Sequence, residues 1–175
     1  VVSTIAGTGT FGSTDGVGSS ASFSNPTGIT IDATGNLYVA EFGSHKIRKI
    51  TSSGVVSTIA GTGSFGSADG IGLTATFGTP TGITIDASGN LYVADYGNHK
   101  IRKITSSGVV STIAGTGSWG SADGNGSTAS FGGPFGITID ATGNLYVAEL
   151  YNHKIRKITS SGVVSTLAGT GSWGS

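Results

Sequence analysis

The stretch from Gly82 to Ala94 decides the fold, and it reads Gly-Ile-Thr-Ile-Asp-Ala-Ser-Gly-Asn-Leu-Tyr-Val-Ala. Its first five residues alternate apolar and polar side chains, and Leu91–Ala94 is a second short run of strand-forming residues. The Asp, Gly and Asn between the two runs are residues that a tight hairpin turn favours. The stretch therefore predicts two antiparallel strands joined by a short turn.

Two more strands follow in the same manner. His99–Ile104 and Val109–Ala114 are again rich in β-branched residues, and the turn residues Thr105–Gly108 separate them. No helical periodicity of useful length interrupts the pattern. Four short antiparallel strands joined by tight turns are typical of one blade of a β-propeller. A parallel β-helix is the rival architecture, but its coils are usually much shorter than this unit.

The whole unit recurs every 54 residues, because Val1-Val2-Ser3-Thr4 returns at Val55, Val109 and Val163. Such a fixed period is the signature of a repeat architecture. The predicted fold class is all-β, a propeller segment of three four-stranded antiparallel blades that form half of a six-bladed ring. The expected boundaries are an outer strand of a preceding or partner blade at 1–9 and blades at 10–63, 64–117 and 118–171.

Composition narrows the function classes. Hydrophobic residues make up 36% of the chain, the formal net charge is zero, and there are 32 glycines but no cysteine. A nucleic-acid or anionic-membrane partner usually requires a basic excess, so neither is expected. No apolar run approaches the roughly 18 residues of a membrane-spanning helix. Few charges with many Ser, Thr and Gly favour an exported bacterial protein, extracellular or at the cell surface.

The motifs resemble those of the NHL-repeat β-propeller family along the whole chain. The resemblance rests on Asn25–Asp32, Gly35–Glu41 and His45–Ile50, and on Asn98-His99-Lys100-Ile101, which is similar to the family's Asn-His-Arg-Ile with Lys in place of Arg. It implies a propeller that usually closes with six blades. It does not imply one activity, because such propellers serve as protein-binding scaffolds, as RNA binders and, more rarely, as enzymes.

Three blades predict self-association. Propellers contain roughly four to eight blades, so an open half-ring would expose the apolar flanks of its end blades. Two copies related by a two-fold axis supply six blades, and a homodimer is the expected assembly. The chain also carries one surplus outer strand, since Val1–Gly9 and Val163–Gly171 differ only at Ile5 and Leu167. Either segment could complete a last blade, and strand donation across the interface would latch the ring.

Almost all differences between the repeats lie in the long connection between blades and in the turn between the second and third strands. Both emerge at the same end of an antiparallel blade, and loops on a rigid scaffold often carry binding function. Loops also tolerate change better than strands, so the variability alone decides nothing. The candidate binding residues at this end are Phe42, Tyr96, Asn98, Trp119, Phe135, Leu150, Tyr151 and Asn152.

Two repeated motifs have structural interpretations. The glycine-rich Asp15-Gly16-Val17-Gly18 lacks the alternating oxygen ligands of a calcium loop, and does not open a helix as a phosphate loop does. We expect a turn that the Asp side chain stabilises. His45, His99 and His153 begin third strands far from the ring axis, so a structural role is expected and no metal site.

The charged residues are also expected to have structural roles. All Lys and Arg lie in the third strands. Glu41 is expected to pair with Lys46 across the turn, and the equivalent acidic and lysine residues of the other two repeats are expected to pair in the same way. No repeat holds a unique set of nucleophile and base, so no enzyme, catalytic residue or cofactor is expected. The predicted function is a non-catalytic, self-assembling scaffold that binds a partner, a protein or a glycan, through its loop-bearing face. The alternatives are a carbohydrate-binding propeller and a purely structural assembly without ligand.

Overall fold

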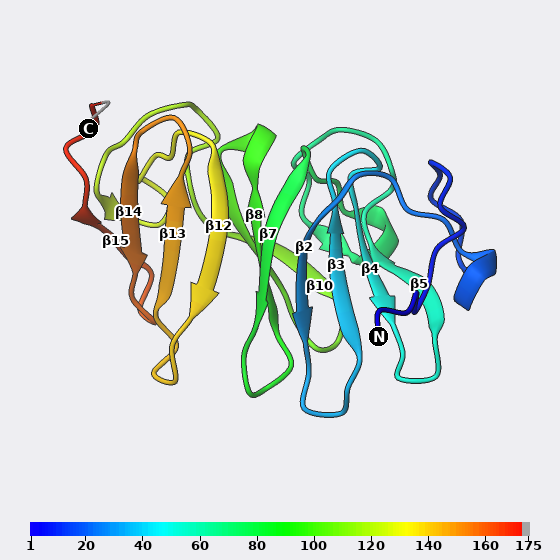
Figure 1. The fold of residues 1–175 in the computed structure, drawn as a ribbon. Helices are drawn as coiled ribbons and strands as arrows, with labels where there is room; N and C mark the ends of the chain where they lie inside the picture. Colours follow the sequence, from blue (N-terminus) through cyan, green and yellow to red (C-terminus); the bar gives the residue numbers. More distant parts are fainter. Residues whose placement is uncertain (173–175) are drawn as a thin grey trace.

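Three antiparallel β-sheets stand side by side in the computed structural model, which describes residues 1–172 (Figure 1). Each sheet is one blade, and the three blades follow one another along the chain. The innermost strands β2 (Pro26–Ile31), β7 (Pro80–Ile85) and β12 (Pro134–Ile139) are neighbours at the centre of the molecule. The architecture is all-β and open, so the predicted partial propeller is confirmed.

The strand order is the same in every blade. Outward from the innermost strand, the first blade continues with β3 (Leu37–Glu41), β4 (Lys46–Ile50), β5 (Val55–Ala60) and β1 (Gly16–Val17). The second blade continues with β8 (Leu91–Asp95), β9 (Lys100–Ile104), β10 (Val109–Ala114) and β6 (Gly70–Ile71). The third continues with β13 (Leu145–Glu149), β14 (Lys154–Ile158), β15 (Val163–Ala168) and β11 (Gly124–Asn125).

Each blade has five strands rather than the four expected from the sequence. The additional strand has two residues, comes from the long connection before the blade, and pairs with the outer strand, as Gly16 does with Val56. A two-residue strand that begins with glycine and is followed by glycine gives no strand signal, which explains why the sequence pattern misses it. The connection continues into a single turn of 3-10 helix, η1 (Gly18–Ser20) or η2 (Gly72–Thr74) in the first two blades.

The predicted hairpin turns form as expected. Asp32 Oδ1 accepts hydrogen bonds of 2.9 Å from the backbone N–H groups of Thr34 and Asn36, and Tyr38 Oη donates to Asp32 Oδ2 at 3.1 Å. Gly35 has a φ of 85°, a conformation that glycine adopts without strain. These turns and those between β4 and β5 form one end of the molecule, the lower end in Figure 1. A further turn of 3-10 helix, η3 (Tyr96–Asn98), lies at the opposite end.

The core lies between the blades. Ile47 and Ala60 of the first blade are fully buried in one cluster with Phe77 and Ile83 of the second. Ile101 and Ala114 repeat this contact with the third blade. Each blade therefore depends on its neighbours for burial, as expected of stacked repeats that cannot cover both faces of their own sheet.

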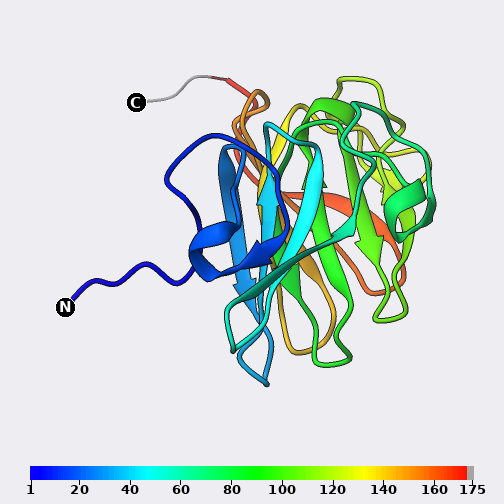
Figure 2. The ribbon, with the colours of Figure 1, turned by 90° about the vertical axis from the view of Figure 1, so that its right-hand side faces the viewer.

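The two copies of the surplus outer strand behave differently. Val163–Ala168 forms β15 and pairs with β14 of its own blade, so it completes the third blade. Residues 1–9 contain no strand, and the N-terminus extends away from the sheets (Figure 2). Over residues 1–172 no helix has the length and apolar character that crossing a membrane would require.

Candidate interaction surfaces

The outward flank of the third blade is exposed where the other blades are covered. Ile155 is 39% exposed, whereas its equivalents Ile47 and Ile101 are fully buried against the next blade. Ala148 and Ala168 are likewise exposed although the corresponding alanines of the first two blades are buried. We call Ala148, Ile155, Leu167 and Ala168 the third-blade flank.

The first blade is exposed on the opposite flank. Ile29 is 62% exposed, whereas Ile83 at the same position of the second blade is 5% exposed. Pro26 is exposed and Phe23 half-buried, while their equivalents in the other two blades are buried. Phe23, Pro26 and Ile29 line an apolar pocket of about 270 Å³. We call Phe23, Pro26, Ile29 and Ile31 the first-blade flank.

Threonine and histidine side chains form hydrogen bonds across each internal junction. Thr81 Oγ1 donates to the carbonyl oxygen of Phe135 at 2.9 Å, and Thr27 Oγ1 donates to that of Thr81 at 3.2 Å. Nδ1 of His45 accepts from the backbone N–H of Thr79 at 3.0 Å, and His99 accepts in the same way from Gly133 at 3.1 Å. The His45 ring also meets the Phe65 ring edge-on at 5.6 Å between centroids.

The inner strands approach one another so closely that the junction requires glycine. A Cβ added to Gly82 would lie 2.5 Å from the carbonyl oxygen of Phe135, and one added to Gly28 would collide with the carbonyl oxygen of Thr81. Neither collision can be relieved by rotating a side chain, because both involve backbone atoms. The third equivalent, Gly136, has only Ala148 Cβ nearby, at 3.7 Å, because no other blade of the described residues packs against this side of the third blade.

A buried ionic network holds each blade together. Arg48 is fully buried, its Nη1 contacts Glu41 Oε1 at 3.1 Å, and its Nη2 contacts Asp15 Oδ1 at 2.7 Å. Its guanidinium lies over the Phe23 ring, 5.3 Å from the centroid. Arg102 and Arg156 repeat the arrangement with Asp69 and Asp95 and with Asp123 and Glu149.

The predicted pairing of Glu41 with Lys46 is therefore wrong. The two residues are opposite each other in the register of β3 and β4, but the Glu41 side chain turns into the blade toward Arg48. Lys46 Nζ instead donates to Ser13 Oγ at 2.9 Å. The buried arginine prevails because a buried carboxylate requires a charged partner.

Asp95 and Asp15, two acidic residues of this network, have shifted pKa values. Burial raises the pKa of Asp95 to about 6, against the opposing effect of hydrogen bonds from Asn98 and the Arg102 charge. For Asp15, burial acts upward but is outweighed by hydrogen bonds from Thr58 and by Arg48, so its pKa lies below the usual value. The glycine-rich loop is thus tied to the third and fourth strands of its blade through Asp15, a role beyond the expected turn.

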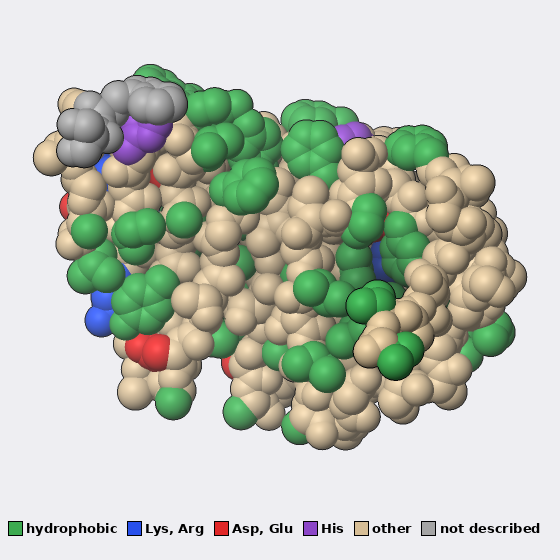
Figure 3. Space-filling model, viewed as in Figure 1, with side chains coloured by type: hydrophobic (Ala, Val, Ile, Leu, Met, Phe, Trp, Pro, Cys, Tyr) green, Lys and Arg blue, Asp and Glu red, His purple; other side chains and the backbone are tan. Residues whose placement is uncertain are grey.

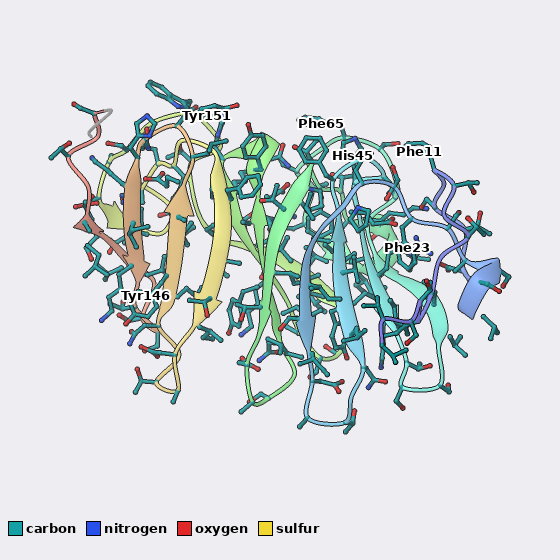
Figure 4. The ribbon with its side chains drawn as sticks, viewed as in Figure 1. Phe11, Phe23, His45, Phe65, Tyr146 and Tyr151 are labelled. Atoms are coloured by element: carbon teal, nitrogen blue, oxygen red, sulfur yellow. The ribbon has the colours of Figure 1, made fainter. Side chains whose placement is uncertain are left out.

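The loop-bearing end gathers aromatic side chains from all three blades (Figure 4). The Tyr96 ring lies 6.2 Å from Phe42, 6.1 Å from Phe135 and 5.8 Å from Tyr151, measured between centroids. The hydroxyl groups of Tyr96 and Tyr151 are hydrogen-bonded to each other, which raises the pKa of Tyr96 to about 12. We call Phe42, Tyr96, Phe135 and Tyr151 the aromatic cluster.

The other candidate residues divide into two groups. Trp119 is 65% exposed, Leu150 is 49% exposed, and Trp119 lines a pocket of about 520 Å³ with Tyr151 and Asn152. Asn98 and Asn152 are buried, and their Nδ2 atoms donate to the carbonyl oxygens of Gly66 and Gly120 at 2.6 Å. Both asparagine amide groups are therefore committed to holding the loops. Hydrophobic side chains remain exposed along this upper edge (Figure 3).

The three histidines are not brought together. Within residues 1–172 there is no group of three or more His, Cys, Asp or Glu side chains that could hold a metal ion. His45, His99 and His153 all have left-handed backbone conformations, with φ between 50° and 56°. Sequence reasoning did not find the histidine acceptors, the Thr27 and Thr81 donors, or the burial of the arginines. For the threonine donors the sequence holds one signal, which is that the third repeat has Phe135 at the position of Thr27 and Thr81.

Comparison with known proteins agrees with this architecture. The NHL repeat model matches residues 23–50 and 77–104, which run from the end of the blade connection through the third strand. The chain is 35% identical over 151 residues to NHL repeat-containing protein 2 of Bos taurus. That match covers 78% of this chain and 21% of the relative, so the chain spans about a fifth of the relative's length.

Solved structures share the fold. An auxiliary nutrient binding protein from Bacteroides ovatus is 26% identical with a TM-score of 0.68, over 83% of this chain and 38% of that chain. A virginiamycin B lyase from Staphylococcus aureus is 18% identical with a TM-score of 0.57, over 84% of this chain and 42% of that chain, a likeness that shows the fold alone. Proteins of this fold thus include enzymes as well as binding proteins. With its repeated blades and matching motifs, the chain belongs to the NHL-repeat family.

Proposed function

We propose that the chain is a non-catalytic repeat scaffold that pairs with a second copy into a closed six-bladed propeller and binds a partner through its loop-bearing end. The supporting observation is the complementary exposure of the two flanks. The third-blade flank is equivalent to the surfaces of the first two blades that carry Ile47 and Ile101. The first-blade flank is equivalent to the surfaces of the second and third blades against which these two isoleucines pack. The internal junctions therefore supply a template for the contact between copies.

The number of copies follows from the number of blades. Propellers have roughly four to eight blades, and six is the only multiple of three in that range. Two copies close the ring through two equal contacts, each joining the third-blade flank of one copy to the first-blade flank of the other. Each contact would bury Ile155 and Ile29, both exposed in the single chain.

Gly136→Ala separates assembly from folding. In the single chain the new Cβ meets only ordinary contacts, but at a closed junction it would face backbone, as Gly28 and Gly82 do. We expect the variant to fold normally and to remain monomeric in light scattering. Leu150→Ser, at an exposed loop position outside the flanks, is the matched control and should assemble like the wild type. Assembly of Gly136→Ala equal to that of the control would contradict the proposed contact.

Partner binding is proposed for the loop-bearing end because the repeats differ there and exposed apolar side chains gather there. Trp119 and Tyr151 are more than half exposed, although burial of such large apolar side chains is usually favourable. Aromatic side chains also dominate binding energy at protein interfaces. A scaffold role suits this arrangement because the blades hold the loops rigidly.

We propose a non-catalytic role for the protein because the acidic residues of the buried network already have structural partners. Asp15 bonds Arg48 and Thr58, and Asp95 bonds Arg102, Asn98 and the Gly78 N–H. A general base must be free to accept a proton from a substrate. Turnover of any substrate that is lost on substitution of these residues, without loss of folding, would overturn this part of the proposal.

Carbohydrate binding is the second candidate, and the aromatic cluster with the adjacent Trp119 pocket favours it. A sugar packs its apolar face on an aromatic ring while its hydroxyl groups find polar partners. The nutrient-binding relative from Bacteroides ovatus is consistent with a small-molecule ligand. A glycan array tests this candidate, and Trp119→Ala and Tyr151→Ala should each abolish any signal. Assembly without any glycan or protein binding would instead leave a purely structural role.

A further inference from the structure

The N-terminal segment contacts the first blade in a specific way. The backbone N–H groups of Gly7 and Thr8 donate to the carbonyl oxygens of Gly18 and Ala21 at 3.1 and 2.8 Å. We call these two carbonyl oxygens the first-blade docking site. Ala6 packs against the core cluster that contains Ala21. Beyond these contacts the segment is exposed, with Ile5 62% and Val2 fully exposed.

The internal junctions use the same pair of bonds. Gly61 and Thr62 donate to Gly72 and Ala75 at 3.2 and 3.0 Å, and Gly115 and Thr116 donate to Gly126 and Ala129 at 2.9 and 3.0 Å. At each internal junction these donors directly follow the outer strand of the preceding blade, since β5 ends at Ala60 and β10 at Ala114. The docking site of a blade is therefore normally filled by the chain leaving the blade before it.

Two segments of this chain fit the first-blade docking site. Residues 7–8 occupy it in the single chain, and Gly169–Thr170, which follow β15, have the same Ala-Gly-Thr-Gly sequence and are exposed. We propose that the first-blade docking site binds Gly169 and Thr170 of a second copy, and that residues 1–9 occupy it only until that copy arrives. This inference rests on the proposed assembly and names the backbone contact that completes it.

The N-terminal segment is the one that leaves because it is held by far less. Its departure breaks two backbone hydrogen bonds and exposes Ala6. The departure of β15 would break its ladder with β14 and its pairing with β11, and would expose Val164, which is 1% exposed. When β15 stays in place, the N–H donors of Gly169 and Thr170 directly follow the outer strand of their blade, as the corresponding donors do at both internal junctions.

Proline substitutions at matched positions test the exchange in the full chain. Thr8→Pro removes the N–H that bonds Ala21, and Thr170→Pro removes the equivalent N–H, in identical Ala-Gly-Thr-Gly surroundings. We expect Thr8→Pro to lower the dissociation constant of the dimer about fivefold for each docking site, and Thr170→Pro to raise it similarly. Thr8→Ala keeps the N–H and should match the wild type. Sedimentation over a dilution series measures all four proteins.

The outcomes separate this inference from the proposed function. A tighter dimer for Thr8→Pro with a weaker one for Thr170→Pro supports the exchange. Dimers of the opposite order would mean that residues 1–9 donate the strand, and equal constants would mean that neither segment enters the contact. Both results overturn the exchange and leave the assembly intact. Monomers throughout, wild type included, would overturn the assembly itself.

Discussion

Nδ1 of His45 accepts a hydrogen bond of 3.0 Å from the backbone N–H of Thr79, and this bond joins the first blade to the second. An imidazole nitrogen can accept only while it is unprotonated. Burial lowers the pKa of His45, and it does the same for His99 at the second junction. The junctions are therefore sensitive to acid.

The first prediction concerns pH. A histidine whose folded-state pKa is lowered contributes stability that is present above its unfolded pKa of about 6.5 and is lost as the pH falls below it. We expect the free energy of unfolding to decrease by about 1 kcal/mol for each of the two bonds as the pH falls. Urea unfolding across the histidine range, about pH 5 to 8, measures this.

Protonation of Asp95 changes the stability in the opposite direction, so its contribution must be separated from that of the histidines. Its pKa is raised to about 6, so the folded state takes up a proton before the unfolded state does. Its contribution therefore increases stability as the pH falls from about 6 toward the unfolded value of about 4. The double variant His45→Gln and His99→Gln retains Asp95, so the difference from the wild type isolates the histidines. Equal pH slopes for the two proteins would contradict the histidine assignment.

The second prediction concerns the buried ionic network. Arg102→Leu leaves the fully buried carboxylate of Asp95 without its charged partner and should destabilise the fold by about 3–5 kcal/mol. Arg102→Lys keeps the charge but not the fork that reaches both Asp95 and Asp69, so its loss should be intermediate. Chemical denaturation measures both. A loss below about 1 kcal/mol for Arg102→Leu would show that the pair is not desolvated.

The third prediction compares two threonines at successive junctions. Thr81 is 1% exposed and donates to the Phe135 carbonyl, so Thr81→Val should cost about 1 kcal/mol of stability. Thr27 is exposed and its bond to the Thr81 carbonyl is longer than the equivalent bond of Thr81, at 3.2 Å, so Thr27→Val should cost less. The same denaturation assay ranks them. An equal or reversed order would mean that burial does not set the strength of these bonds.

The fourth prediction concerns the glycine at the internal junction. Gly82→Ala places a Cβ against the backbone carbonyl of Phe135, which cannot move without separating the second and third blades. We expect a loss of about 1–3 kcal/mol, the usual cost of inserting volume into a packed core. Gly136→Ala is the matched control, because its surroundings are open in the single chain. Equal stability of the two variants as monomers would contradict the close approach.

Much of this architecture could be predicted from the sequence, because its signals are local. Alternating runs such as Gly82–Ile85 and turns such as Asp32–Asn36 specify their own strands and hairpins, and the repeat multiplies them. The blade-to-blade contacts are not local. The sequence pattern indicates that Arg48 is a charged residue on an outer strand. Its burial depends on Asp15 and Glu41, which approach it only after the blade has formed.

The candidate site was predictable only in part for the same reason. Phe42, Tyr96 and Tyr151 were found because they lie in the variable turn between the second and third strands, and Phe135 because the repeats differ at its position, which the structure places in β12. The four rings do come together. The loops alone could not show that the amides of Asn98 and Asn152 point inward to the carbonyl oxygens of Gly66 and Gly120. Side-chain direction there depends on how the connection folds back over the turn.

The mass of the wild-type chain in solution, measured by light scattering after size exclusion, tests the central claim most directly. Closure of the propeller by two copies predicts twice 17.2 kDa, with no larger species as the concentration rises. A mass of 17.2 kDa at the highest soluble concentration would show that the two flanks tolerate water and that the blades do not close a ring with a second copy.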